Sequence, residues 1–354
     1  MIASFSAGAR GAERVNPAKA IAAAVGPYPV ATERGNVSPA PLAALINPLS
    51  FRMRIHDASA LSSDRVRAHG GVVYPVTNLI EIEQSLRQAT RDGIGRLVLA
   101  GGDGTLQGAV SWLLRNCPND DLPDLIVLAA GRTNYVAADI GTRSNFIATL
   151  EAVLARPLAQ LHPIDRHTLE CRHPSIGIQH GFFLAGAIVD ETLRHAHHEQ
   201  GRGGARLRQY AASSLSVIGL LWRAVLGRHR FELPQLDIDA GPLGRFQGRC
   251  RFLLATSLPL QAHLVDPYAR RGQGELRLTV IGAKARRWRT RLPRILLGRF
   301  GATMTSESGY LSGRIESATL SGIERITLDG QEFDLDPSQP LELRTGPRLR
   351  FLRP

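Results

Sequence analysis

Cysteine is scarce in this sequence. Its three cysteines, Cys117, Cys171 and Cys250, lie far apart and form no CxxC pair, which excludes a disulfide framework and a structural zinc site. No stretch reaches the roughly 18–20 uninterrupted apolar residues that a membrane-spanning helix needs. The N-terminal residues lack the compact apolar core of a secretory signal. We therefore expect a cytoplasmic protein whose contact with any membrane is peripheral.

Lysine is scarcer still, because Lys19 and Lys284 are the only two, and arginine supplies almost all of the formal net charge of +12. The sequence has no GxxxxGK[ST] loop, and neither lysine lies where a protein kinase carries its strand lysine, so both of these kinase designs are excluded. Excess positive charge favours nucleotides, nucleic acid or an anionic membrane face. With 6% aromatic residues and no nucleic-acid-binding signature, we expect no nucleic-acid partner.

The sequence pattern changes twice along the chain. Residues 1–40 are rich in Ala, Gly, Pro, Ser and Arg without a sustained period, which predicts a flexible arm. Between 41 and 165, short apolar strands alternate with helices, which predicts an α/β nucleotide-binding domain with a parallel sheet. The expected strands are 42–46, 71–76, 96–100 and 125–128, and the expected helices are 80–91 and 106–114. From 166 to 354, short alternating runs predict a larger, mainly antiparallel β-sandwich domain, with helices at 205–226 and 284–299.

The most informative motif is Gly101-Gly102-Asp103-Gly104-Thr105, which joins a buried strand to a helix. Glycine has no Cβ, so the main chain can approach a phosphate closely, and the first N–H groups of the following helix face the anion. Asp103 is suited to orient Mg²⁺ or to take a proton from an attacking hydroxyl. The alternative is a tight Asp-Gly turn without a ligand, but the position between strand and helix favours a phosphate-binding loop.

Further motifs stand on both sides of this loop. Asn47-Pro48-Leu49-Ser50 follows the first expected strand, Thr77 the second, and Gly131-Arg132-Thr133-Asn134 the fourth. Asp329-Gly330-Gln331 lies near the C-terminus. In this order and together with the glycine loop, these motifs make residues 42–352 resemble the diacylglycerol kinase catalytic-domain superfamily, which includes sphingosine kinases, ceramide kinases and bacterial lipid kinases.

The resemblance implies a nucleotide domain like that of NAD kinase, a β-sandwich domain that carries the lipid site, and a reaction in the cleft between them. It implies ATP and Mg²⁺ as cofactors and a lipid alcohol as substrate. Asp103 is the implied metal partner and catalytic carboxylate, and Asp329 and Glu332 are the other catalytic candidates. The implied ATP-binding residues are Asn47, Pro48, Ser50, Thr77, Gly101, Gly102, Gly104, Thr105, Gly131, Arg132 and Asn134.

Gln331 departs from the family, because a neutral amide cannot act as the base assigned to the family's glutamate. Glu332 is adjacent but faces the opposite side of a regular strand, so Asp103 is the leading candidate for the base. These residues favour a kinase that transfers the γ-phosphate of ATP to the primary hydroxyl of diacylglycerol, ceramide or a sphingoid lipid. The alternatives are a non-catalytic lipid-binding or regulatory relative, and a soluble kinase of the NAD kinase type.

One charged segment lies outside these motifs. Residues 284–299 combine six arginines with Trp288 and an apolar stripe, a composition that suits the headgroup region of an anionic leaflet. We expect peripheral association with the anionic inner face of a membrane. The alternative is an ordinary domain helix with a solvated arginine face.

Overall fold

The computed structural model describes residues 41–54, 58–118, 121–131, 134–142, 145–187, 233–259 and 266–354. Residues 40–354 belong to one compact unit. The expected arm (1–40), the expected helix 205–226 and Arg132 lie outside the described residues. The division into two domains at residue 165 stays a prediction.

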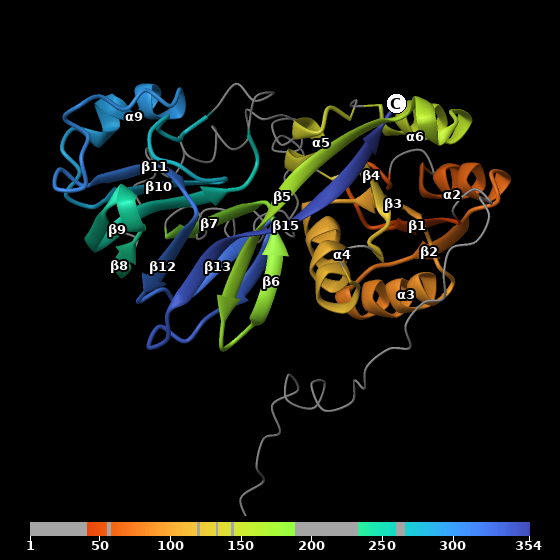
Figure 1. Ribbon diagram of the computed structural model, residues 1–354, viewed down its shortest axis with the longest axis horizontal. Coiled ribbons are helices and arrows are strands. Elements are labelled where there is room, and N and C mark those ends of the chain that lie inside the picture. The colour runs from red at the N-terminus through yellow and green to blue at the C-terminus, as the bar shows by residue number, and fades with distance from the viewer. Residues whose placement is uncertain are drawn as a thin grey trace, which may run out of the picture. The chain divides into compact units, whose positions relative to one another are not determined.

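The first part of the chain forms a parallel sheet (Figure 1). Its strands are β1 (Leu42–Ile46), β2 (Val72–Pro75), β3 (Arg96–Gly101) and β4 (Asp124–Ala129), which pair in the order β2-β1-β3-β4. Every residue of β1 is buried, as expected for a central strand covered on both faces. The four strands expected from the sequence are confirmed.

Helices cover both faces of this sheet. Successive side chains of a strand point to opposite faces, and Leu45 of β1 packs in one core cluster while Ile46 packs in another. The Leu45 cluster includes α3 (Leu79–Arg91), α4 (Asp103–Asn116) and α5 (Tyr135–Asp139). The Ile46 cluster includes α2 (Ala58–Ala68) and α6 (Phe146–Ala155). The helices α3 and α4 lie close to the expected ranges.

The rest of the chain forms mainly antiparallel strands around a further core cluster. Within the described residues, these strands pair with one another in antiparallel fashion, which confirms the antiparallel character expected for 166–354. The likeness to NAD kinase and the sandwich arrangement stay predictions. The strands are β5 (His162–His173), β6 (Gly177–Gly181), β7 (Phe183–Ala187), β8 (Gln235–Asp239), β9 (Arg245–Thr256), β10 (Leu276–Gly282), β11 (Tyr310–Ile315), β12 (Ser317–Ser321), β13 (Arg325–Leu328), β14 (Gln331–Asp334) and β15 (Leu341–Arg353).

Two elements differ from expectation. Residues 181–183, one of the short alternating runs that predict strands in 166–354, form a corner instead, because β6 ends at Gly181 and β7 begins at Phe183. The helix expected at 284–299 is shorter, since α9 spans Trp288–Leu296 and contains Pro293. No helix in the described part of the chain is long and apolar enough to cross a membrane.

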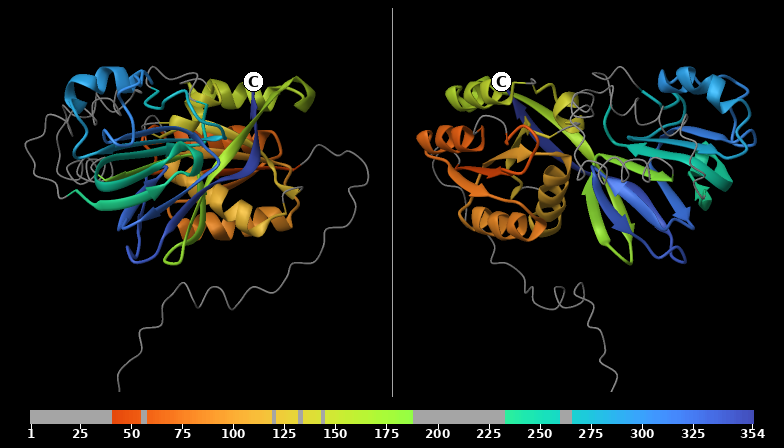
Figure 2. Two further views of the ribbon diagram at one scale, coloured as in Figure 1. Left: turned by 60° about the vertical axis from the view of Figure 1, so that its left-hand side comes forward. Right: turned by 180° about the vertical axis from the view of Figure 1, so that it is seen from behind.

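The parallel and antiparallel strands belong to one mixed sheet, and β15 makes the connection. β15 pairs antiparallel with β5 along most of its length, and its Phe351 also pairs with Leu125 of β4 in parallel. Figure 2 shows the long β5 and β15 strands from two further directions. The late strand β15 therefore extends the sheet that early residues begin.

Candidate functional site

The carboxyl ends of β1 and β3 lie side by side in the sheet. From β1 the chain passes to β2 on one side, and it then crosses β1 to form β3 and β4 on the other. In open α/β sheets, ligands bind at such a change of direction, beyond the carboxyl ends of the strands. Asn47 follows β1 and Gly102 follows β3, so the two expected nucleotide loops leave the sheet at this point.

Hydrogen bonds tie the loops after β1, β3 and β4 together. Asn47 Nδ2 donates to Thr105 Oγ1 at 3.0 Å, and the Asn47 N–H donates to the Ala100 carbonyl at 2.8 Å. The Arg52 N–H donates to the Ala130 carbonyl at 3.0 Å. The structure therefore brings the Asn-Pro loop and the glycine loop together.

The glycine loop and the segment after β4 approach so closely that side chains do not fit between them. A Cβ on Gly131 would lie 2.7 Å from the Cα of Gly102, and a Cβ on Gly101 would lie 2.6 Å from the Thr105 side chain. Asn134, in the left-handed region with φ 50°, fixes this approach. Its Oδ1 accepts from the Gly131 N–H at 2.7 Å, and its Nδ2 donates to the Gly131 carbonyl at 2.9 Å. A small pocket beside these residues is lined by Leu99, Gly101, Gly102, Asp103, Leu106, Val127, Leu128, Asn134 and Ala137.

The N-terminus of α4 differs from two other helix starts in the molecule. Asn78 caps α3 and Asn145 caps α6, each by accepting a main-chain N–H with its side chain. Gly102, the cap residue of α4, has no side chain with which to do this. The first N–H groups of a helix have no acceptor within the helix, and they favour an anion. This end of α4 is therefore suited to phosphate.

Two carboxylates, Asp103 and Asp329, come together here from distant parts of the sequence. Asp103 is the first residue of α4, and its Oδ2 lies 3.5 Å from the Tyr135 N. Asp329 is 4% exposed, and its carboxylate accepts the Phe182 and Phe183 N–H groups at 2.8 and 2.9 Å. Burial raises the pKa of Asp329 well above its usual range, the charge of Asp103 raises it further, and the two amide bonds oppose both effects.

The hairpin turn between β13 and β14 explains how Asp329 reaches this place. Asp329 and Gly330 both have positive φ, 47° and 83°, and Leu328 pairs with Gln331 across the turn. Asp-Gly is a preferred sequence for such two-residue turns. The Asp329 N–H also donates to the Phe183 carbonyl at 2.9 Å, which fastens the turn to β7. The corner at Phe182 was missed from the sequence, although it supplies both amide partners of Asp329.

The remaining candidates lie around this centre or apart from it. Pro48 and Ser50 lie in the turn after β1, and the Ser50 N–H donates to the Asn47 carbonyl at 3.1 Å. Thr77 is exposed after β2, and its N–H and Oγ1 both donate to Glu81 Oε2, at 2.6 and 2.8 Å. Glu332 is exposed on β14, where no hydrogen bond within the described residues joins it to Asp103 or Asp329.

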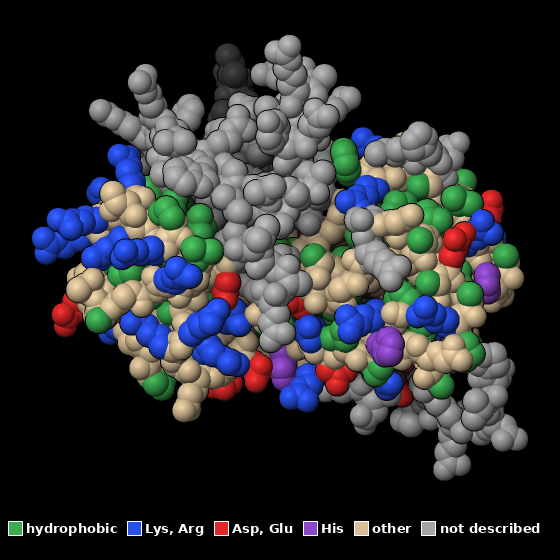
Figure 3. All heavy atoms as spheres, turned by 90° about the horizontal axis from the view of Figure 1, so that it is seen from above, with side chains coloured by type: hydrophobic (Ala, Val, Ile, Leu, Met, Phe, Trp, Pro, Cys, Tyr) green, Lys and Arg blue, Asp and Glu red, His purple; other side chains and the backbone are tan. Residues whose placement is uncertain are grey.

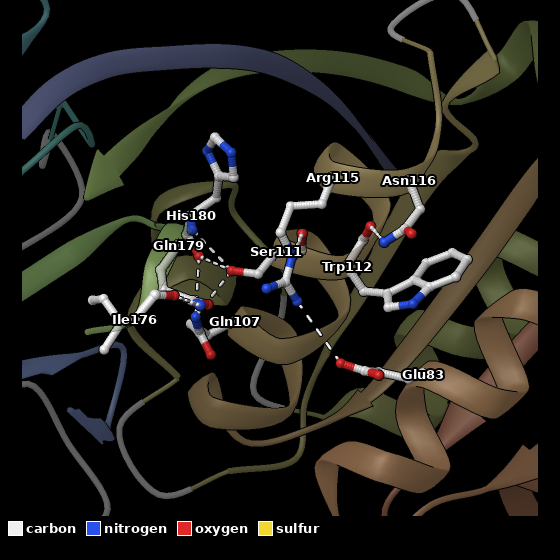
Figure 4. Close-up of polar contacts among 9 residues, drawn as sticks. All are labelled: Glu83, Gln107, Ser111, Trp112, Arg115, Asn116, Ile176, Gln179 and His180. Carbon is white, nitrogen blue, oxygen red and sulfur yellow. Dashed lines mark hydrogen bonds and ion pairs between the residues drawn. The ribbon is translucent and has the colours of Figure 1, made fainter. Parts of the chain in front are cut away.

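A buried polar cluster connects α4 to the corner that holds Asp329 (Figure 4). Ser111 Oγ accepts the His180 N–H at 2.8 Å and donates to the His180 carbonyl at 2.8 Å. Gln107 Nε2 donates to the same carbonyl at 3.3 Å and to Ser111 Oγ at 3.0 Å. We call these three residues the α4–β6 clamp. Sequence reasoning missed it, although two polar residues one turn apart within an apolar helix were a usable signal.

His180 is buried within the clamp as a neutral ring. Its side chain is 4% exposed, and Nδ1 lies 3.5 Å from Thr168 Oγ1. Burial lowers the pKa of His180 to about 4, Arg115 and Arg172 also lower it, and Glu170 acts in the opposite direction. Because His180 is two residues from Phe182, the clamp sets the distance between α4, which carries Asp103, and the corner that holds Asp329.

Comparison with known proteins gives a family match and a common fold. Residues 41–165 match the family model of the diacylglycerol kinase catalytic domain. The structure is similar to one solved for a provisionally named diacylglycerol kinase of Bacillus anthracis str. Sterne, with 12% identity, 89% of this chain and 97% of that chain covered, and a TM-score of 0.62. A second structure with the same provisional name has 12% identity, coverages of 88% and 96% and a TM-score of 0.60.

A third structure, described as a diacylglycerol kinase of the same organism, has 12% identity, coverages of 89% and 97% and a TM-score of 0.56. A search of curated proteins finds no match. At this identity the three structures establish a common fold. The family match confirms, over residues 41–165, the resemblance indicated by the motifs.

Proposed function

We propose that this chain, which matches the diacylglycerol kinase catalytic domain over residues 41–165, is an ATP-dependent lipid kinase. One observation supports this most strongly: the loops after β1, β3 and β4 meet around the uncapped start of α4, where Asp103 lies. The reaction would transfer the γ-phosphate of ATP to the primary hydroxyl of a membrane lipid, such as diacylglycerol, ceramide or a sphingoid base.

The ATP phosphates would be held mainly by the main chain. The start of α4 and the Gly131 segment offer N–H groups where no Cβ obstructs the approach. Asn47 holds the first loop against Thr105 and so fixes the geometry of the site. Ser50 and Thr77 stay expected ATP contacts, as does Arg132, and a nucleotide that contacts Thr77 Oγ1 would compete with Glu81 for it.

Asp103 is the residue that fits Mg²⁺. Mg²⁺ in kinases is usually bound through one or two carboxylates together with substrate phosphates rather than by a cage of protein ligands. The described residues accordingly hold no group of three or more His, Cys, Asp or Glu side chains arranged for a metal. When bound, the ion neutralises charge on the phosphates. The proximity of Asp329 to Asp103 also favours a cation at this position, since two like charges repel.

Asp103 is also our candidate for the base that takes the proton of the lipid hydroxyl. Asp329 is less suited to that role, because it is buried and both of its oxygens accept main-chain N–H groups. We assign Asp329 the task of holding the Phe182–Phe183 corner beside Asp103. In this mechanism Gln331 need not supply a base, so a glutamine at this position is compatible with an active kinase.

The test is transfer of labelled phosphate from ATP to diacylglycerol, ceramide, sphingosine and NAD, with the products separated by chromatography. We expect a phosphorylated lipid, and Asp103→Asn should lower kcat about 10³-fold, the range found for loss of a general base. Asp64→Asn is the matched control, because Asp64 is an exposed aspartate on α2. Phosphorylation of NAD but of no lipid would overturn the proposal, as would equal lipid turnover by Asp103→Asn and the wild type.

A further inference from the structure

The segment 284–306 contains basic residues but no acidic ones. Lys284 and six arginines lie in it, and the first acidic side chain after it is Glu307. Most of these basic side chains are exposed in the structure, namely Lys284, Arg286, Arg287, Arg289, Arg294 and Arg299. Figure 3 shows Lys and Arg side chains gathered on the side of the molecule where Figure 1 places α9.

These basic residues differ from several arginines elsewhere that form ion pairs with acidic side chains. On α2, Arg65 pairs with Glu151 and Arg67 with Asp64, and on α4 Arg115 pairs with Glu83. Within the described part of the chain, no ion pair involves a basic residue of 284–306. A codon bias toward arginine explains the residue type but not the absence of acidic residues from 284–306.

The helix α9 is anchored to the core by its apolar face, which lies opposite its exposed basic side chains. Leu292, Ile295 and Leu296 are buried in the same core cluster as Val136 and Ala137 of α5. Trp288 lies under two guanidinium groups, those of Arg251 at 4.6 Å and Arg289 at 5.5 Å from the ring. The basic face is therefore a rigid surface with an ordered arrangement of charge.

This surface also has apolar groups at its edge, and it lies on the same core as the candidate site. Leu297, directly after α9, is 51% exposed. A Cβ on Gly298 would lie 2.8 Å from the Tyr268 carbonyl, so the end of α9 is in contact with Tyr268. Tyr268 is in turn near enough to Tyr135 to affect its pKa, and the Tyr135 N lies 3.5 Å from Asp103 Oδ2.

We propose that the exposed basic residues of 284–299, together with Leu297, form the surface on which this protein docks onto an anionic lipid leaflet. This proposal rests on the proposed lipid kinase function, because a kinase whose acceptor lipid lies in a membrane must bind to that membrane. Arginines that have no ion pair among the described residues and that lie on a packed helix complement anionic headgroups. Each basic residue near such a surface contributes about fivefold to the partition coefficient. An exposed leucine beside them enters the apolar edge of the headgroup region.

The test is sedimentation of the protein with vesicles of phosphatidylcholine alone or with ~30% phosphatidylglycerol. The variant Arg286→Gln/Arg294→Gln removes two exposed charges from the surface, and Arg87→Gln/Arg91→Gln removes two exposed charges from α3. Both variants lower the net charge equally. We expect binding to the anionic vesicles alone, weakened about 25-fold by the first variant and about twofold or less by the second.

Equal weakening by both variants would overturn the proposal, because it would show a diffuse charge effect. Vesicle binding that neither variant weakens would do so too, as would tighter binding to duplex DNA than to anionic vesicles at the same salt. Turnover of dioctanoylglycerol, which is short enough to be presented without a bilayer, tests the kinase function separately. The first variant should keep that turnover, and a wild type that binds vesicles but phosphorylates no lipid would refute the kinase function alone.

Discussion

The loops around Asp103 and the surface on α9 are suited to bind phosphate groups in two different ways. The loops use glycines whose main chains nearly touch, as at Gly102 and Gly131, and side chains that are buried or half-buried. The α9 surface uses long, exposed side chains over a packed helix. The close main-chain contacts of the loops are disrupted when a single atom is added or removed. The contributions of the exposed charged side chains to binding are instead roughly additive. The expected effects of substitutions therefore separate the two regions.

Among substitutions that leave both carboxylates in place, the largest effect is expected where the glycine loop and the Gly131 segment approach each other most closely. In Gly131→Ala the new methyl group would lie 2.7 Å from the Gly102 Cα, so the glycine loop must move. A displacement of about 1 Å near the reacting groups lowers kcat about 10²-fold. Gly301→Ala is the matched control, because Gly301, like Gly131, does not have positive φ, and nothing lies within 4 Å of its Cβ position. Unchanged lipid turnover in Gly131→Ala would show that the loop is not held as tightly as the structure indicates.

The α4–β6 clamp extends this tight region, and acid should weaken it. The pKa of His180 is about 4 in the fold and 6.5 without its surroundings, so the unfolded chain binds a proton first as the pH falls. Stability should therefore decrease between pH 6.5 and 4, by about 2 kcal/mol from this residue at pH 4.5. His180→Gln should show a smaller decrease in the free energy of unfolding from pH 7 to pH 4.5, measured in urea. An identical decrease in both proteins would contradict a neutral, buried His180.

A smaller loss of stability is expected when the Ser111 hydroxyl of the same clamp is removed. Ser111→Ala removes the hydroxyl that accepts the His180 N–H and donates to the His180 carbonyl. The loss of these two buried hydrogen bonds should lower the free energy of unfolding by about 1–2 kcal/mol. Ser62→Ala is the matched control, because this buried hydroxyl donates only to the Ala58 carbonyl of its own helix. If Ser111 also positions Asp103 relative to Asp329, kcat should decrease with little change in KM for ATP. A purely structural role would leave kcat unchanged.

The smallest effect on stability is expected at the α9 surface. Arg294 is exposed and unpaired among the described residues, so Arg294→Gln should change the free energy of unfolding by about 0.5 kcal/mol or less. Its partition onto anionic vesicles should still decrease about fivefold. Urea unfolding and sedimentation on the same preparation measure both. A loss of stability above that limit would show that the arginine face supports the fold.

Much of the first part of the fold was predictable, because β1, β3 and β4 are buried along most of their length and glycines follow β3 and β4 closely. Leu42–Ile46 was expected from five consecutive apolar residues, and Gly101–Thr105 from glycine chemistry at a strand end. The partners of Asp329 were not predictable in this way. They are the main-chain N–H groups of Phe182 and Phe183. Because every residue except proline has such a group, the sequence does not indicate which N–H groups bind a carboxylate.

Glu332, three residues after Asp329, illustrates a second limit of prediction from the sequence. The alternation of a regular strand predicts that Glu332 and Gln331 face opposite sides, and in the structure Glu332 is exposed on β14. Whether residue 329 or residue 332 reaches Asp103 depends on the tight turn at Asp329-Gly330 and on its attachment to β7. Such an attachment joins residues far apart in the sequence, and a local pattern does not contain it.

The position of β15 has a consequence for how the protein is made. The edge of β4 is covered by β15 through Phe351 and Leu125, yet a ribosome produces β4 long before β15. Domains generally fold as they emerge, so the nascent chain displays an open parallel edge throughout synthesis of all the strands in between. An uncovered edge is a template for pairing with other chains. We therefore expect newly made chains to present this edge until β15 has been made.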